Sequence, residues 1–346
     1  MRLRDAALRG GRLALAHLLG RAVPFHVTLS VTQRCNERCV YCSRSDEIQP
    51  ELAAAEWCGV LDELRRLGTE RVVFCGGEPL MRDDLAQIVA HARALGLRCA
   101  LTTNGALVPQ RRDVVTMLQT LIVSLDGDAA AHDRNRGKGS HARALAAIEA
   151  ARAWNIPTKV NAVFNANNAR SLDWLVEFCQ SRRLPLTLSI MRSETSPLWK
   201  EAAGHRLGDR QVRALLGRII AAKDTSRCIV FSKSTFRRSR QWPDFARDRI
   251  SRAEVGRRSV EPPCSAGRFH CIVEPDGRLF PCVVTIGRVP ALDVRRAGVA
   301  RALDRARRHG CAACHAQCLL EVNALFGLRP GVLLGLARTY LGGRME

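Results

Sequence analysis

The chain has 346 residues, of which 47% are hydrophobic, and its formal net charge is +21. This length and composition exclude a disordered chain and allow one large α/β domain with a smaller one beside it. The charge favours acidic partners, such as nucleic acid, an anionic membrane surface, a phosphorylated substrate or an acidic peptide. No stretch approaches the roughly 20 consecutive apolar residues that a membrane-spanning helix needs.

Between residues 25 and 223, apolar runs typical of strands alternate with segments typical of helices. The expected strands are 25–31, 71–75, 98–103, 121–126, 158–164 and 185–191. The expected helical segments end near Leu67 or cover 83–95, 111–118, 141–154, 171–181 and 209–222. Six such units in series predict a parallel sheet with right-handed crossovers, two units short of a closed (β/α)8 barrel.

Three further regions follow or precede this core. Residues 224–263 are polar and rich in arginine, with weak periodicity, and are interpreted as a linker. Residues 264–325 form a compact cysteine-rich segment, and 326–346 are an apolar helix candidate. The first 24 residues and the last 21 combine arginines with leucines, which suits peripheral contact with an anionic membrane surface. The alternative is that both ends are helices packed against the barrel.

The fourteen cysteines come without a clear signal peptide, which predicts a reducing, cytoplasmic compartment and metal ligation rather than disulfides. Cys35, Cys39 and Cys42 stand in the string CNERCVYC directly after the first expected strand. A four-iron cluster is normally held by four thiolates. A tight loop with three cysteines therefore leaves one iron available to an outside ligand. A structural zinc site is the alternative, although such sites usually close with a fourth Cys or His nearby.

Polar and glycine-containing motifs follow the next strands, at the end of a parallel sheet where barrel enzymes carry their chemistry. They are GGEP at 76–79, TTNG at 102–105, SLDG at 124–127 and HDRNRG at 132–137. Glycines let the backbone approach a ligand closely, and Pro79 stiffens the first of these turns. The alternative interpretations are simple turns, a helix cap or a salt bridge at Asp126, and a surface position for Arg136.

Taken together, these motifs resemble those of the radical S-adenosylmethionine (SAM) superfamily. The resemblance implies a partial (β/α)6 barrel and a [4Fe–4S] cluster on Cys35, Cys39 and Cys42. It also implies a SAM site formed by Tyr41, Gly76, Gly77, Glu78, Asn104, Ser124, Asp126, Arg136 and Asn161. In this family the reduced cluster cleaves SAM, and the resulting deoxyadenosyl radical abstracts hydrogen from a substrate.

The C-terminal segment opens with CSAGRFHCIVEPDGRLFPC, in which Asp276-Gly277 is typical of a hairpin turn. This string resembles the opening of SPASM and twitch domains, which implies an auxiliary iron–sulfur cluster. The candidate ligands are Cys264, Cys282, Cys311, Cys314 and Cys318, with two of the last three expected to bind and the role of Cys271 left open. Zinc, or a c-type haem on the string Cys311-Ala-Ala-Cys314-His315, is the alternative. The remaining cysteines (Cys58, Cys75, Cys99, Cys179 and Cys228) are expected to be free buried thiols.

The expected function is therefore radical SAM chemistry on a peptide or another natural-product precursor, with a lipid substrate as the alternative. A reductant such as ferredoxin or flavodoxin is the implied partner. Two non-enzyme interpretations are a metal-dependent nucleic-acid-binding protein and an iron–sulfur electron carrier. The basic residues are dispersed and no aromatic-studded pattern accompanies them, which argues against nucleic acid. No residue is assigned as a catalytic acid or base.

Overall fold

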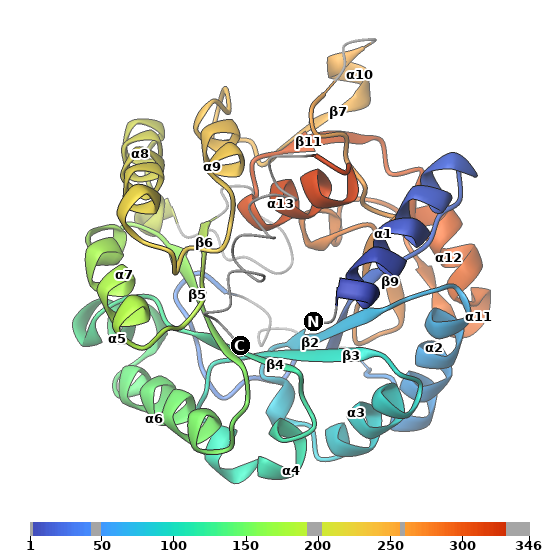
Figure 1. Cartoon of the computed structure of the whole chain (residues 1–346), viewed down its shortest axis with the longest axis horizontal. Coiled ribbons are helices and arrows are strands. Elements are labelled where there is room, and N and C mark those ends of the chain that lie inside the picture. The colour runs from blue at the N-terminus through green and yellow to red at the C-terminus, as the bar shows by residue number, and fades with distance from the viewer. Residues whose placement is uncertain (1–2, 43–49, 192–202, 257–259, 330–346) are drawn as a thin grey trace.

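A computed structural model describes residues 3–42, 50–191, 203–256 and 260–329 of the chain. Its centre is a nine-stranded sheet in the order β10-β9-β8-β1-β2-β3-β4-β5-β6 (Figure 1). Six neighbouring strands run parallel in chain order: β1 (His26–Thr32), β2 (Arg71–Gly76), β3 (Arg98–Thr103), β4 (Thr120–Ser124), β5 (Thr158–Phe164) and β6 (Leu186–Ile190). The expected partial (β/α)6 barrel is thereby confirmed.

Helices cover the outer face of this curved sheet (Figure 1). They are α2 (Ala54–Arg66), α3 (Leu85–Ala94), α4 (Arg112–Val115), α5 (Ala129–Arg136), α6 (Ser140–Ala153), α7 (Leu172–Ser181) and α8 (Asp209–Thr225). Single 3-10 turns occur at η1 (Pro79–Met81), η2 (Val108–Gln110), η3 (Ala169–Ser171), η4 (Ala203–His205) and η5 (Val283–Thr285). Alternate strand residues such as Val27 and Leu29 are buried in the main core. Their neighbours therefore face the inside of the barrel.

Two details of the barrel differ from the expectation. The helix expected over 111–118 is the four-residue α4, and the glycine-rich loop expected after the fourth strand contains α5. Asp128 caps α5 by accepting a hydrogen bond from the Ala131 backbone N–H at 3.1 Å. Helix α5 ends at Arg136, so this cap and helix determine where that arginine lies.

The cysteine-rich segment extends the barrel sheet on its other side. Strand β8 (His270–Val273) pairs parallel to β1, followed antiparallel by β9 (Arg278–Phe280) and β10 (Leu292–Asp293). The expected turn at Asp276-Gly277 joins β8 to β9, with Gly277 at φ +84°. Helices α11 (Val294–Ala297) and α12 (Val299–Ala306) follow, and the Val299 N–H donates to a Glu63 carboxylate oxygen of α2 at 2.8 Å. One sheet thus crosses the predicted boundary between core and auxiliary domain.

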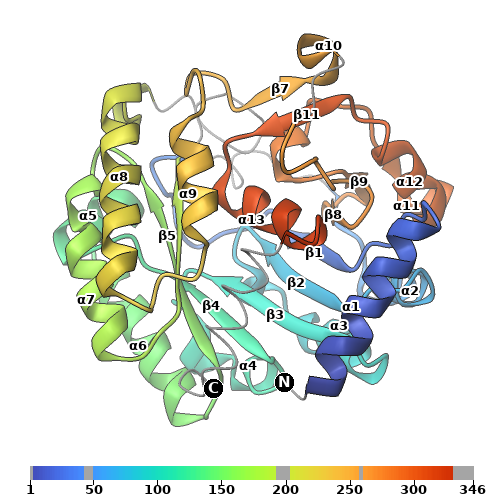
Figure 2. The same ribbon diagram turned by 45° about the horizontal axis from the view of Figure 1, so that its top comes forward.

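Residues 224–263 contain more structure than a linker. Helix α9 (Lys233–Arg240) packs beside α8, while β7 (Arg249–Ser251) and α10 (Arg252–Val255) lead toward the cysteines (Figure 2). Strand β7 pairs antiparallel with β11 (Cys311–Cys314). The sequence predicts a linker here because the stretch is polar and rich in arginine, with weak periodicity, and Phe236 is the large apolar side chain that α9 buries.

Helix α13 (Gln317–Phe326) lies between the β6 side and the β8 side of the sheet (Figures 1 and 2). At its start the Gln317 side-chain oxygen accepts a hydrogen bond from the Ile190 N–H of β6 at 2.9 Å. At its end Phe326 stacks against Phe25, which precedes β1, with ring centroids 6.1 Å apart. Helix α13 therefore closes the side on which the six-unit barrel is incomplete.

Helix α1 (Leu3–Leu18) packs on this same end of the molecule. Leu13 and Ala16 are buried against Phe25, Phe269 and Phe326. Leu15, Leu18 and Leu19 are exposed. The tail helix expected over 326–346 lies outside the described residues from position 330 onward. Within the described ranges, no helix has the length and apolar character to cross a bilayer.

Candidate SAM and iron–sulfur sites

The three cysteines of the first motif lie on the loop that leaves the carboxyl end of β1. The loop is tight, since the Cys42 N–H donates to the Cys39 carbonyl at 3.1 Å. Burial raises the pKa of Cys35 to about 11 and that of Cys39 to about 12, and the nearby Cys42 sulfur adds to both shifts. At neutral pH these thiols would give up their protons to a bound cation. Soft thiolate donors on one loop suit iron.

A buried ion pair connects this loop to the end of β4. The fully buried Asp126 carboxylate accepts hydrogen bonds from Arg136 Nε at 2.7 Å, the Tyr41 hydroxyl at 2.9 Å and the Val163 N–H at 3.0 Å. Burial opposes the charge of Asp126, but the Arg136 guanidinium outweighs it and lowers the pKa. Arg136 Nη1 also lies 3.8 Å from the Cys39 sulfur. Three predicted site residues are thus brought together beside the cysteine loop.

The GGEP turn requires its glycines because β1 and β2 approach each other closely there. A Cβ atom on Gly76 would lie 2.2 Å from the Thr32 carbonyl oxygen, and one on Gly77 would lie 2.2 Å from the Arg34 carbonyl oxygen. The Gly77 N–H donates to the Thr32 carbonyl at 2.8 Å, which fixes this approach. Both glycines therefore position the start of the cysteine loop, and contact with SAM stays a prediction for them.

Glu78 is fully buried and connects the ends of β2 and β3. Its carboxylate accepts hydrogen bonds from the Leu80 N–H at 3.1 Å, the Thr103 hydroxyl at 2.9 Å and the Asn104 N–H at 2.8 Å. Burial raises the pKa of Glu78 to about 7, against the opposing effect of these donors. Asn104 in turn donates through Nδ2 to the Asn36 side chain of the cysteine loop at 2.7 Å.

Ser124 and Asn161 are register partners on β4 and β5, on the inner side of the barrel. The Asn161 side-chain oxygen accepts a hydrogen bond from the Thr187 hydroxyl of β6 at 2.9 Å. The structure thus places eight of the nine predicted SAM-site residues at the carboxyl ends of the parallel strands or in the segments just beyond them, with Arg136 at the end of α5, whereas Asn161 lies in the middle of β5. Their binding to SAM stays a prediction.

Sequence reasoning missed two residues that hold Asp126 in place. His132 is fully buried, and its Nδ1 accepts a hydrogen bond from the Asp126 N–H at 3.0 Å. Burial and the charge of Arg136 lower the pKa of His132 to about 4, so the ring is neutral with its proton on Nε2. Asn168 donates to the Asp126 carbonyl at 2.7 Å. The HDRNRG string contained His132, but only the fold shows that the ring turns back to the strand end.

A second group of thiols gathers where the C-terminal segment meets β7 and β11. Burial raises the pKa values of Cys264, Cys311 and Cys314, and the nearby Cys282 sulfur adds to each of these three shifts. Cys282 and Cys314 share a small buried cluster against which Cys264 packs. Cys311 and Cys314 thus lie with Cys264 and Cys282, and Cys318 lies in the first turn of α13; which two of the last three cysteines bind metal stays a prediction.

Cys271 is placed elsewhere. It lies on β8, opposite Val27 of β1, and belongs to the main hydrophobic core. Burial alone raises its pKa to about 12. Among the described residues, no three His, Cys, Asp or Glu side chains already stand in a metal-binding arrangement. The assignment of both thiol groups as iron ligands stays a prediction, supported by the chemistry of the donors.

A partial parallel barrel with a thiol loop at its carboxyl edge, and a second thiol group beside it, defines an enzyme class built around sulfur-ligated cofactors. Residues 29–178 match the family model described as the radical SAM superfamily. The PqqA peptide cyclase of Rhodopseudomonas palustris is 30% identical over 268 residues, which are 75% of this chain and 67% of that protein. The chain belongs to the radical SAM superfamily, whose enzymes use a [4Fe–4S] cluster and SAM.

Two further comparisons extend this assignment. The Fe-coproporphyrin III synthase of Methanosarcina barkeri is 31% identical over 166 residues, which are 46% of this chain and only 42% of that protein. The crystal structure of Streptococcus suis SuiB bound to S-adenosylmethionine superposes with a TM-score of 0.63 at 17% identity, over 88% of this chain and 71% of that one. At that identity the likeness shows the shared fold.

Proposed function

We propose that this chain cleaves SAM reductively and abstracts hydrogen from a peptide or another natural-product precursor. The observation that carries the proposal is the contact between the cysteine loop and the buried Asp126–Arg136–Tyr41 network. That network holds the Arg136 guanidinium beside the thiols, with Nε paired to Asp126 and Nη1 3.8 Å from the Cys39 sulfur, so that its N–H groups would be available to donate to the carboxylate of SAM. The cluster that Cys35, Cys39 and Cys42 would hold supplies the electron for the reductive cleavage of SAM.

The protein's own residues then have defined tasks. Asp126 holds the Arg136 guanidinium in one orientation, and Tyr41 covers that guanidinium with its ring, at 5.7 Å from the centroid. His132 and Asn168 hold the Asp126 backbone, so the charge pair does not need to reorganise when SAM binds. Glu78 keeps the β2 and β3 ends together at the same edge.

We assign the auxiliary cluster to Cys264, Cys282, Cys311 and Cys314. Four thiols satisfy the four irons of a [4Fe–4S] cluster without an outside ligand. A cluster closed in this way suits electron transfer better than direct binding of substrate. Cys318 and Cys271 are not needed by this assignment.

A peptide substrate is supported by the similarity to the PqqA peptide cyclase, which covers three quarters of the chain. The similarity to the AdoMet-dependent heme synthase of Methanosarcina barkeri covers 78% of the chain at 29% identity, so the extent of similarity does not by itself separate a peptide from a porphyrin. Since both relatives share the SAM-binding half, the substrate must be tested directly.

The experiment is anaerobic reconstitution with iron and sulfide, followed by dithionite and SAM. We expect deoxyadenosine, roughly eight irons per chain, and a spectral change when SAM is added. The triple change Cys35→Ala, Cys39→Ala and Cys42→Ala should abolish deoxyadenosine and leave about four irons. Cys314→Ser should lower the iron content, whereas Cys271→Ser should keep it. A reconstituted wild-type chain that forms no deoxyadenosine would contradict the proposal.

We further propose cytoplasmic residence, with electrons supplied by ferredoxin or flavodoxin. The fourteen free cysteines suit a reducing compartment.

We also propose contact of α1 with an anionic membrane surface. Leu15, Leu18 and Leu19 are 54%, 84% and 52% exposed, and the chain is strongly basic. Such a leucine cluster on a basic protein can enter the headgroup region. Co-sedimentation with phosphatidylglycerol liposomes should fall when the three leucines are changed to glutamine; equal binding by both proteins would exclude this contact.

A further inference from the structure

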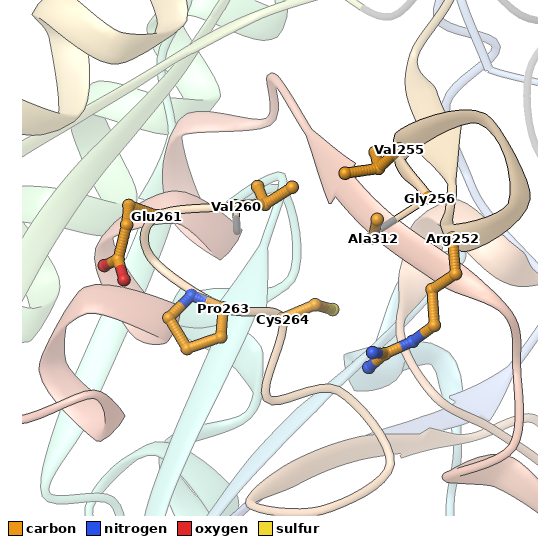
Figure 3. A pocket seen from close by; sticks show the side chains of 8 residues that line it. All are labelled: Arg252, Val255, Gly256, Val260, Glu261, Pro263, Cys264 and Ala312. Atoms are coloured by element: carbon orange, nitrogen blue, oxygen red, sulfur yellow. The ribbon is translucent and has the colours of Figure 1, made fainter. Parts of the chain in front are cut away.

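A pocket of ≈ 390 Å³ opens beside the auxiliary thiols (Figure 3). Its lining includes Arg252 and Val255 of α10, Val260, Pro263 and the Cys264 side chain itself. It is partly open to solvent. One of the four thiols assigned to the auxiliary cluster therefore forms part of the wall of a surface cavity.

The pocket is electrostatically positive. In Figure 3 the Arg252 guanidinium is directed to the same side as Cys264, whereas the Glu261 carboxylate points away from them. Glu261 forms an ion pair with Arg329. For Arg252, no hydrogen bond or ion pair of its guanidinium is recorded with the described part of the chain.

The lining does not resemble that of a site for a small molecule. Such sites usually combine several converging polar groups with apolar walls. Among the described lining residues, Arg252 and Glu261 are the polar side chains other than Cys264, and Glu261 is already paired. One accessible guanidinium surrounded by Val255, Val260 and Pro263 instead suits a small, charge-steered protein contact. Complexes of electron-transfer proteins are commonly of this weak and small kind.

We propose that this pocket is the docking point at which an acidic one-electron carrier protein meets the auxiliary cluster. The inference rests on the proposed function, because it takes Cys264 as an iron ligand. Cys264 would hold the cluster at the pocket wall, and an oxidised carrier docked there would take up one electron, being reduced as the cluster is oxidised. No bond forms or breaks, and no proton moves.

The test is binding of two acidic carriers, a plant-type [2Fe–2S] ferredoxin and a flavodoxin, to the anaerobically reconstituted full chain. At low ionic strength we expect Arg252→Glu to weaken binding of at least one carrier about tenfold or more, which is about 1.4 kcal/mol. Arg252→Gln should weaken it less, because it removes a charge without reversing it. Raising the salt concentration should reduce the difference between wild type and variant. Iron content and thermal unfolding show whether each variant is intact.

Arg210→Glu is the matched control, since Arg210 is an exposed arginine in the first turn of α8 and does not line the pocket. It changes the net charge equally and should alter binding less than about twofold. Equal weakening by Arg210→Glu and Arg252→Glu, or no carrier binding by the wild type, would overturn the proposal. If the protein binds citrate in a way that depends on Arg252 but binds neither carrier, the pocket is a small-anion site and the docking proposal is wrong. Deoxyadenosine formation by the wild type with dithionite tests the proposed function separately.

Discussion

The Asp126–Arg136 pair is the individual contact on which the SAM site depends most. Both side chains are nearly inaccessible, with 0% and 8% exposure, and the guanidinium joins the strand end to the cysteine loop. A buried pair of this kind contributes little when intact, because the desolvation of both charges opposes their attraction. Removing one partner is different, since it leaves the other charge buried and uncompensated.

Arg136→Ala should therefore lower the free energy of unfolding of the apoprotein by about 3 kcal/mol or more. Urea denaturation followed by circular dichroism measures this change. Arg152→Ala is the control, because Arg152 forms only an exposed 4.0 Å contact with Glu149. It should change stability by no more than about 0.5 kcal/mol. Similar losses for the two variants would contradict the role given to the buried pair.

Which site residues the sequence could predict depended on local spacing. Cys35, Cys39, Cys42 and the GGEP turn were predictable because each motif is contiguous and follows an apolar strand. His132 and Asn168 were not, because their partners lie across turns whose geometry no spacing rule describes. The grouping of Cys311 and Cys314 with Cys264 likewise needed the β7–β11 pairing, which joins segments about 60 residues apart.

At the scale of elements, the junction of β1 and β2 requires glycine at positions 76 and 77, because there is no room there for a side chain. Gly77→Ala would place a methyl group 2.2 Å from the Arg34 carbonyl oxygen, so the cysteine loop would have to shift. We expect a loss of several kcal/mol, on the order of the larger effects of single substitutions, together with weaker iron loading. In contrast, Gly59 lies inside α2 with no atom within 4 Å of an added Cβ. Gly59→Ala should stabilise by about 0.5–1 kcal/mol; thermal unfolding of both variants gives the comparison.

A second element-scale prediction concerns the pairing of β8 with β1. His270 on β8 is buried, and burial lowers its pKa from 6.5 to about 4. As the pH falls below about 6.5, the His270 imidazole therefore becomes protonated in the unfolded chain before it does in the folded one. His270 thus contributes to stability above that pH, and the contribution is lost progressively toward pH 4, at about 1.4 kcal/mol per pH unit.

His270→Leu should reduce the slope of the apoprotein's free energy of unfolding against pH between those two pH values. The reduction should correspond to the uptake of about one proton. The measurement is the free energy of unfolding in urea across the range. Ile272→Val serves as control, because Ile272 is a buried residue of the same strand that carries no ionisable group, and it should leave the slope unchanged. An unchanged slope in the His270 variant would show that this ring already titrates as in the unfolded chain.

Element order was largely predictable because each barrel unit is local, with an apolar strand followed by an amphipathic helix. The stretch 224–263 was not, since the short α9, β7 and α10 gain their stability from α8, α13 and β11 rather than from their own periodicity. Likewise, nothing local to HCIV at 270–273 indicates that this strand pairs with β1, more than 200 residues earlier.

For the whole molecule, the shared core argues against two independent domains. Val27 and Trp57 of the barrel belong to the same buried cluster as Val273, Leu279 and Leu303 of the C-terminal segment. The apoprotein should therefore unfold in a single cooperative transition. Midpoints from tryptophan fluorescence and from far-ultraviolet circular dichroism should coincide in urea. Two separated midpoints would show that the cysteine-rich segment is an autonomous unit.

The position of α13 has a consequence for how the protein would respond to iron shortage. The helix begins three residues after Cys314, is tied to β6 through Gln317, and ends with Phe326 against Phe25. The residues that would retain the auxiliary metal are thus continuous with those that complete the barrel wall. Iron starvation would then do more than interrupt electron transfer. It would weaken the packing between the first and last units of the barrel, and cellular proteases would cleave the opened chain.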